Sequence, residues 1–124
     1  MDPPPKVVAT QFVLAVPSLA EAEPYWRDVL GFVRRESPPG WLFLSLDGHG
    51  VMLGECPDDP APAALGSHSY FGYFQLADLD AYARAIQSRG AVVLSGPADK
   101  PWGMREMAVA TPAGHRMMFA QRLA

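Results

Sequence analysis

The sequence lacks the features that several classes of protein require. It has a single cysteine, Cys56, which excludes a disulfide within the chain and leads us to expect an intracellular, cytoplasmic location. No apolar run approaches the roughly 18 residues that cross a bilayer, so we expect no membrane-spanning helix and no membrane partner. Residues 1–6 include three prolines and no signal-peptide pattern, and they predict a short extended tail.

The sequence also lacks a large excess of charge of either sign. The net charge is only −3, and Arg34–Arg35 is the one basic doublet, whereas a nucleic-acid-binding surface needs a basic stripe. We therefore expect no nucleic-acid partner, and the small acidic excess is compatible with a cationic ligand. Cys56 has no neighbour in the sequence that would activate it as a nucleophile, so we expect no catalytic thiol.

The first half of the chain, residues 7–55, predicts the order β-α-β-β-β. Its opening strand, 7–16, is rich in β-formers and is bounded by prolines. Ser18 and Glu21 have the spacing of a capping box that starts a helix, and Gly31 ends that helix. Turn residues then separate three further strands, at 32–36, 41–46 and 51–55.

The second half repeats this order after a linker. Residues 56–68 contain three prolines and no periodicity, and they divide the chain. Within 69–121, a strand is followed by a helix that Asp78 can cap, and then by three more strands. The last two strands form a hairpin over 101–121 that turns at Thr-Pro-Ala-Gly, residues 111–114. This internal repeat, with a period of about 60 residues, predicts a duplicated α+β fold.

Two motifs within the repeat resemble a known family. Residues 25–32, Tyr-Trp-Arg-Asp-Val-Leu-Gly-Phe, are similar to the first-helix signature of the vicinal oxygen chelate superfamily, which includes glyoxalase I, bleomycin resistance proteins and extradiol dioxygenases. Residues 101–106, followed by the turn at 111–114, resemble the second module of its bleomycin resistance branch. Thr111 stands where the family usually has Asp, and we expect this difference to affect the turn more than the function.

The resemblance implies an architecture and a partner. Each βαβββ module would curve its sheet into a half-barrel, with the helix outside and a ligand groove inside, and two modules would pair across a homodimer. The strand pattern agrees, because large apolar side chains occupy one face and mixed side chains the other. The helix-packing positions are Phe12, Leu14, Val16, Phe74 and Leu76. The groove-facing positions are Gln11, Trp41, Phe43, Phe71, Tyr73 and Gln75.

Metal-dependent members of the family use four ligands, usually His and Glu. The positions carried over to this chain hold Gln11, Gly54 or Leu53, Phe71 and Met118. Glutamine alone is a poor metal ligand, and the other side chains offer no oxygen or imidazole ligand. Glu55 would serve only with a shifted strand register. The histidines are not spaced like a site: His49, His68 and His115. We therefore predict no metal and no cofactor, which favours the non-metal branch of bleomycin resistance proteins.

Members of that branch bind a flat, cationic antibiotic in an aromatic-lined groove. The residues carried into such a groove here are Gln11, Trp41, Phe43, Phe71, Tyr73, Trp102, Glu106 and Met118. Each has a structural alternative. Trp102 either stacks on a planar ligand, or packs beneath its hairpin or across the dimer. The other aromatics either line a groove or fill a barrel core. Glu106 either meets a cation in the groove, or forms an ion pair with Arg105 or part of the dimer interface, which is the interpretation we favour.

Three functions remain open from the sequence. The first is binding and sequestration of a small molecule, such as a cationic antibiotic, without catalysis. The second is a glyoxalase-type lyase, isomerase or dioxygenase-like enzyme. It would use a metal at an atypical set such as Gln11 and Glu55, or acid–base chemistry by Glu106 or His115. The third is a regulatory or structural dimer whose pocket is filled by its own side chains.

Overall fold

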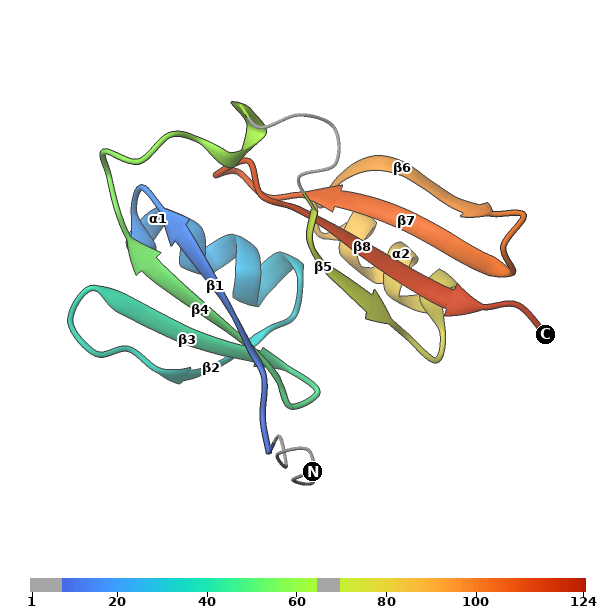
Figure 1. Cartoon of the computed structure of the whole chain (residues 1–124), viewed down its shortest axis with the longest axis horizontal. Coiled ribbons are helices and arrows are strands. Elements are labelled where there is room, and N and C mark those ends of the chain that lie inside the picture. The colour runs from blue at the N-terminus through green and yellow to red at the C-terminus, as the bar shows by residue number, and fades with distance from the viewer. Residues whose placement is uncertain (1–7, 65–69) are drawn as a thin grey trace, which may run out of the picture.

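The computed structural model describes residues 8–64 and 70–124, which form two four-stranded sheets, each with a helix on one side (Figure 1). The first module contains β1 (Gln11–Val16), α1 (Leu19–Pro24), the π-helical turn η1 (Tyr25–Val29), β2 (Val33–Glu36), β3 (Trp41–Leu46) and β4 (His49–Glu55). A 3-10 turn, η2 (Pro62–Ala64), follows. The second module contains β5 (Tyr70–Gln75), α2 (Leu79–Ser88), β6 (Val92–Asp99), β7 (Met104–Ala110) and β8 (Arg116–Arg122).

The two sheets have the same topology, so the predicted α+β duplication is confirmed. Their strand orders are β1-β4-β3-β2 and β5-β8-β7-β6, and in each the first strand pairs in parallel with the last. The pair Val13–Met52 in the first sheet corresponds to the pair Tyr73–Met118 in the second. The predicted tail at 1–6 and His68 lie outside the described residues.

Both helices begin at the predicted caps. The Ser18 hydroxyl accepts a hydrogen bond from the Glu21 amide at 3.2 Å, and the Asp78 carboxylate accepts one from the Ala81 amide at 3.1 Å. Pro24 has no N–H to donate to the preceding turn, and α1 widens there into η1. The first helix is therefore short and irregular, whereas α2 is a regular amphipathic helix.

One hydrophobic core runs through both modules. It lies between each sheet and its helix, and an aromatic cluster joins the two halves. Phe12 contacts Phe71 and Phe74 across the module boundary, with ring centroids 5.5 and 5.7 Å apart. Trp26, on η1, is fully buried and contacts Phe71 as well. The two modules of the chain are therefore packed against each other and do not form separate units.

Tyr25 fastens the modules with hydrogen bonds. Its hydroxyl donates to the Ala110 carbonyl at 2.7 Å and accepts from the Val92 amide at 3.0 Å. Burial raises the pKa of Tyr25, and the hydrogen bond from Val92 opposes this. In the reverse direction, the Tyr82 hydroxyl of α2 donates to the Leu30 carbonyl at 2.7 Å. Each helix therefore carries a tyrosine that binds the other module.

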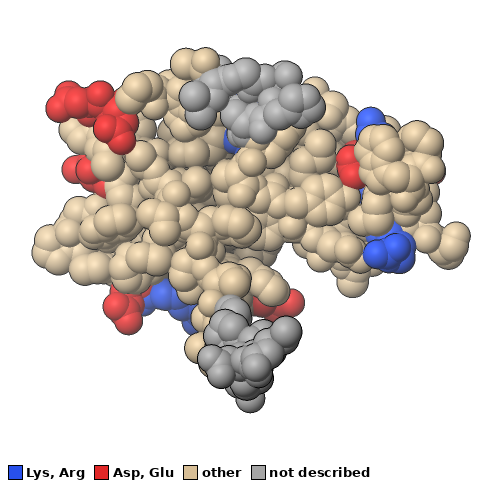
Figure 2. Space-filling model, in the orientation of Figure 1, with Lys and Arg blue, Asp and Glu red and all other residues tan. Residues whose placement is uncertain are grey.

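We call the face of each sheet that lies away from its helix the open face. In Figure 1, α1 and α2 lie behind their sheets, so both open faces point toward the viewer. Figure 2 shows this side of the molecule as largely uncharged, with charged groups gathered at its rim. The helix-facing side chains are buried, and they include Leu14, Val16, Leu42, Leu44, Val51, Leu53, Met107, Val109, Met117 and Phe119.

The predicted alternation holds along β3, and along β5 except at Phe71. The register between β5 and β8 shifts between Tyr70 and Gly72, which turns Phe71 away from the face that Tyr73 occupies. Phe71 packs instead against the hydrophobic core. Phe71 therefore does not share a face with Tyr73 as predicted, because a period of two fails across a β-bulge, and a role of Phe71 in ligand binding stays a prediction.

Among the described residues, no helix has the length and apolar character needed to cross a membrane.

Candidate functional site

Three of the predicted site residues meet on the open face of the second module. The Glu106 carboxylate, on β7, accepts two hydrogen bonds through the same oxygen, Oε2. One comes from the Tyr73 hydroxyl on β5 at 2.6 Å, and the other comes from the Trp102 indole N–H at 2.9 Å. Two aromatic side chains therefore hold one carboxylate from different elements. We call Tyr73, Trp102 and Glu106 the carboxylate cluster.

Local sequence explains how these side chains converge. Glu106 pairs with Ala120 on β8, whose small side chain leaves room above the sheet. Trp102 lies in the turn that precedes β7, where Gly103 has a φ of 86°, a conformation that glycine adopts without strain. Met118 pairs with both Tyr73 and Ala108, so it shares the open face with the cluster.

Burial and exposure differ sharply within the cluster. Glu106 is only 7% exposed, whereas Tyr73 is 49% exposed and Trp102 is 64% exposed. A buried carboxylate needs hydrogen-bond donors or a cation to offset lost hydration. Both donors here are neutral, and Glu106 forms no ion pair within the described part of the chain. The carboxylate is held in place by neutral donors, and none of the described Lys, Arg or His side chains forms an ion pair with it.

The predicted alternative, an ion pair between Arg105 and Glu106, is not formed. Arg105 points to the opposite side of β7 and binds Asp99 at 2.7 Å and Asp80 at 2.9 Å. These two carboxylates raise the pKa of Arg105 through hydrogen bonds. The sequence left the facing of both residues undecided, and the structure turns Glu106 to the open face.

The cluster keeps Tyr73 protonated. Lost hydration raises the pKa of Tyr73 to about 12, and the hydrogen bond to Glu106 and its negative charge add to this effect, while Arg122 opposes it. The phenol is therefore a hydrogen-bond donor at neutral pH. The rings of Tyr73 and Trp102 remain available for contact with a ligand.

The other predicted residues lie on the open face of the first module. The Gln11 side chain lies across Gly50, where any Cβ would overlap the amide. The Trp41 ring lies over Gly54, where a Cβ would come within 3.0 Å of the ring. Phe43 contacts Trp41 with ring centroids 6.2 Å apart. Glycines on β4 therefore let two site side chains lie flat on the sheet.

A groove of 350 Å³ runs along this first open face. Its lining includes Gln11 and Phe43 together with Arg35, Ser45 and Met52. The volume falls within the roughly 300–1,000 Å³ of small-molecule pockets. Ser45 shares a face with Trp41 and Phe43 by simple alternation, but Arg35 was not predicted because its orientation depends on an irregular pairing of β2 with β3.

The predicted residues therefore form two separate groups within one chain. The carboxylate cluster and Met118 lie on the second module, and Gln11, Trp41 and Phe43 lie on the first. Phe71 joins neither group and contacts His115, with ring centroids 6.3 Å apart. Burial lowers the pKa of His115, and a hydrogen bond between the His115 side chain and the Ala15 backbone opposes this.

Glu55 and Gln121 occupy equivalent positions at the ends of β4 and β8, and their side chains form equivalent hydrogen bonds. The Glu55 carboxylate accepts a hydrogen bond from the Leu19 amide at 2.8 Å, and the Gln121 amide oxygen accepts one from the Leu79 amide at 2.8 Å. Each caps the start of a helix. Glu55 therefore faces α1 rather than the groove.

The structure also revises the positions carried over for a metal. Met118 corresponds to Met52 in the repeat, rather than to Gly54 or Leu53. Methionine at both positions supplies only a thioether, which does not suit the hard metals of this chemistry. Within residues 8–64 and 70–124, no three His, Cys, Asp or Glu side chains gather as a metal site would require.

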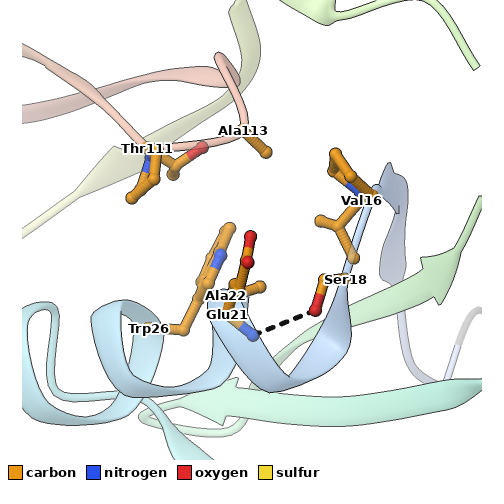
Figure 3. Close-up of a pocket in the computed structure, with 9 residues that line it drawn as sticks. Val16, Ser18, Glu21, Ala22, Trp26, Thr111 and Ala113 are labelled. Atoms are coloured by element: carbon orange, nitrogen blue, oxygen red, sulfur yellow. Dashed lines mark hydrogen bonds between the residues drawn. The ribbon is translucent and has the colours of Figure 1, made fainter. Parts of the chain in front are cut away.

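Further cavities lie elsewhere. A cavity of only 80 Å³ between the start of α1 and the β7–β8 turn is lined by Ser18, Glu21, Trp26 and Thr111, among others (Figure 3). It is too small for a flat aromatic molecule. A cleft of 420 Å³ between the modules is lined by Phe12, Phe74 and Tyr73, among others. Tyr73, a member of the carboxylate cluster, therefore also lines this cleft.

The chain belongs to the glyoxalase/bleomycin resistance protein/dioxygenase superfamily, whose family model matches residues 9–119. The family predicted from the two motifs is thus confirmed. No curated protein matches the chain.

Solved structures share the fold at low sequence identity. TnmS3, an antibiotic binding protein from Streptomyces sp. CB03234, matches with a TM-score of 0.71 and 24% identity over 94% of this chain and 97% of that chain. TioX from Micromonospora sp. ML1 matches with a TM-score of 0.77 and 23% identity over 94% and 100%. A glyoxalase/bleomycin resistance protein/dioxygenase from Alicyclobacillus acidocaldarius reaches 0.80 with 12% identity over 94% and 92%.

Proposed function

We propose that this protein binds and sequesters a flat, cationic small molecule, such as an antibiotic, without converting it. The observation that carries the proposal is the carboxylate cluster, in which Glu106 is buried, held by neutral donors and free of an ion pair within the described residues. A cationic ligand would supply the missing counter-charge in a site of reduced dielectric, where that charge counts most.

The aromatic side chains of the cluster favour a planar ligand. Trp102 and Tyr73 together expose large ring surfaces next to a negative charge. Aromatic faces attract cations and stack on flat rings, and Trp is the strongest of them. Met118 adds an adaptable apolar contact on the same face. The ligand would therefore place its ring system against the two aromatics and its cationic group near Glu106.

A second copy of the chain completes the groove in this proposal. Each module has an exposed aromatic side chain, Trp41 on the first and Trp102 on the second. Pairing the first module of one copy with the second module of another would enclose a ligand between them. The description of TnmS3 as an antibiotic binding protein supports a small-molecule ligand, and the dimer is an expectation from the family resemblance. We place the dimer in the cytoplasm, an expectation that rests on the single cysteine.

A pair of acridine dyes tests the proposal. Proflavine is flat and cationic at neutral pH, whereas acridine has the same fused rings and is uncharged at mildly alkaline pH. We expect the protein to bind proflavine more tightly than acridine, and we expect Glu106→Gln to weaken proflavine binding about tenfold by removing a charge-assisted contact. Fluorescence titration measures both affinities, and mass spectrometry of the recovered dye checks that it is unchanged.

Asp28→Asn is the matched control. It removes one exposed carboxylate on η1, outside both open faces, and should leave proflavine affinity as it is in the wild type. Equal weakening of proflavine binding by Asp28→Asn and Glu106→Gln would show that the loss comes from the change in net charge and not from a contact with Glu106. Equal affinities for wild type and Glu106→Gln would contradict the proposal.

A further inference from the structure

The pairing of β2 with β3 gives Arg35 a special position. Arg34 pairs with Leu44 and Glu36 pairs with Phe43, so Arg35 is the extra residue of a β-bulge. A bulge re-aims the side chain that it carries. Arg34 binds Glu23 of α1 at 3.3 Å, on the helix side of the sheet. Arg35 instead reaches the Ser45 hydroxyl on β3, with its Nε donating at 2.7 Å.

The contact with Ser45 fixes the guanidinium and leaves its outer edge available. Ser45 is only 5% exposed, so its hydroxyl is a fixed acceptor at the base of the groove. The bond uses Nε, and the two terminal nitrogens of Arg35 have no hydrogen bond or ion pair to any described residue. Two parallel N–H groups on a planar fork match the two oxygens of an acid group.

The surroundings of Arg35 form a row across the sheet. Gln11 pairs with Gly50, and Gly50 pairs with Ser45, so these three positions are neighbours on β1, β4 and β3. The Gln11 amide lies over Gly50, toward the strand that carries Ser45. Phe43 and Met52 supply the apolar part of the same 350 Å³ groove. An amide, a guanidinium and an apolar surface thus converge in one place.

Glu36 lies in the same groove, and its charge has to be considered. Figure 2 shows basic and acidic atoms side by side at the edge of the first module, where β2 lies. Glu36 is exposed and forms no ion pair with Arg35. It therefore lowers the positive potential without occupying the guanidinium fork.

We propose that the groove of Gln11, Arg35 and Ser45 is a subsite for an acidic oxygen group on an aromatic ligand: a carboxylate, a sulfonate or an ionised phenol. The Arg35 fork binds the anion, the Gln11 amide donates to it, and Phe43 and Met52 contact the ring. The inference rests on the proposed function, that the open faces bind a small molecule, and it adds a second chemical requirement. The ligand carries an acidic group remote from its cationic one.

Two naphthalene dyes separate the acid group from the ring. 8-Anilinonaphthalene-1-sulfonate carries a sulfonate, and N-phenyl-1-naphthylamine has the same rings without it. We expect wild type to bind the sulfonate dye more tightly than the neutral dye in fluorescence titrations. Arg35→Gln should weaken the sulfonate dye about tenfold and leave the neutral dye within a factor of two.

Arg34→Gln is the matched control, because it removes the same charge one residue away on the other side of the strand. It should leave the ratio of the two affinities unchanged. Ser45→Ala keeps the charge and loosens the guanidinium, so it should weaken the sulfonate dye by a smaller factor. Thermal unfolding of each variant confirms that it is folded before titration.

Three results would overturn the subsite: an unchanged affinity ratio in Arg35→Gln, an equal loss in Arg34→Gln, or no binding of either dye. Proflavine distinguishes this failure from failure of the proposed function. If proflavine affinity depends on Glu106 while the affinity for the sulfonate dye is the same in Arg35→Gln, the proposed function is supported and the anion subsite is contradicted. If the affinity for the sulfonate dye depends on Arg35 while proflavine does not bind, the subsite is supported and the proposal of a cationic ligand is contradicted.

Discussion

The open face of the first module carries a guanidinium and an amide above glycines, whereas the open face of the second carries a carboxylate held by aromatic donors. The two modules share the strand order and have equivalent helix caps. The comparison teaches that topology and capping are set by the helix side of each strand. The side chains on the open side are free to differ, and they define what each module can bind.

The largest expected effect separates the helix side from the open side of one sheet. Phe119→Ala empties a fully buried position on β8 and should lower the free energy of unfolding by about 3–5 kcal/mol. Trp102→Ala removes an aromatic that is 64% exposed and should cost no more than about 1 kcal/mol. Urea denaturation measures both. Similar losses in the two variants would mean that Trp102 belongs to the core.

The caps test how alike the modules are. Glu55→Ala and Gln121→Ala each remove the side-chain acceptor at a helix start, and each should cost about 1 kcal/mol. The losses should add in the double variant, because the sites lie in different modules. Glu36→Ala, at an exposed position, serves as the control and should be nearly neutral. A loss confined to one cap would break the equivalence of the modules.

Much of this architecture could be predicted from the sequence. Ser18 and Asp78 start the two helices as expected, because a side-chain oxygen before an apolar stripe is a strong local signal. Alternation also placed Tyr73, Trp41 and Phe43 on the open face, since each lies in a regularly paired stretch.

Other features could not be predicted because they depend on bulges and on tertiary contacts. The irregular pairing near Phe71 changes the facing that a period of two implies, and the one between Arg34 and Glu36 places the consecutive residues Arg35 and Glu36 in the same groove. The bond from Trp102 to Glu106 depends on the turn before β7, and the bond from Tyr73 joins residues far apart in the chain. Neither contact has a signature in local sequence.

The cluster on the second module should also be visible in the titration of Tyr73. Lost hydration is the largest cause of its raised pKa of about 12 and stays in Glu106→Gln, but the pKa should still fall part of the way toward the ordinary value of about 10, since the negative charge that accepts the hydrogen bond from the phenol is lost. The raised pKa contributes stability that is fully present below about pH 10 and is lost as the pH rises toward 12. Ultraviolet absorbance titration, with Tyr73→Phe as the reference, measures the shift. An identical titration in wild type and Glu106→Gln would argue against the hydrogen bond.

The smallest expected effect concerns the glycines of the first module. Gly54→Ala places a methyl group within 3.0 Å of the Trp41 ring, which must tilt by a few tenths of an ångström. We expect a change in unfolding free energy within about 0.5 kcal/mol and a change in sulfonate-dye affinity below threefold. Denaturation and dye titration measure these values. A tenfold loss of dye affinity would show that Trp41 has a larger part in the first open face than its exposed position implies.

The most direct test of the central claim observes Trp102 itself. In a spectrum of the indole N–H groups of 15N-labelled protein, Trp102 reports on the cluster through its bond to Glu106, and the buried Trp26 serves as an internal reference. If a cationic planar ligand binds at the cluster, titration with proflavine will move the Trp102 signal in a saturable manner and leave Trp26 in place. Saturable binding of proflavine with an unmoved Trp102 signal, or no binding at all, would contradict the account.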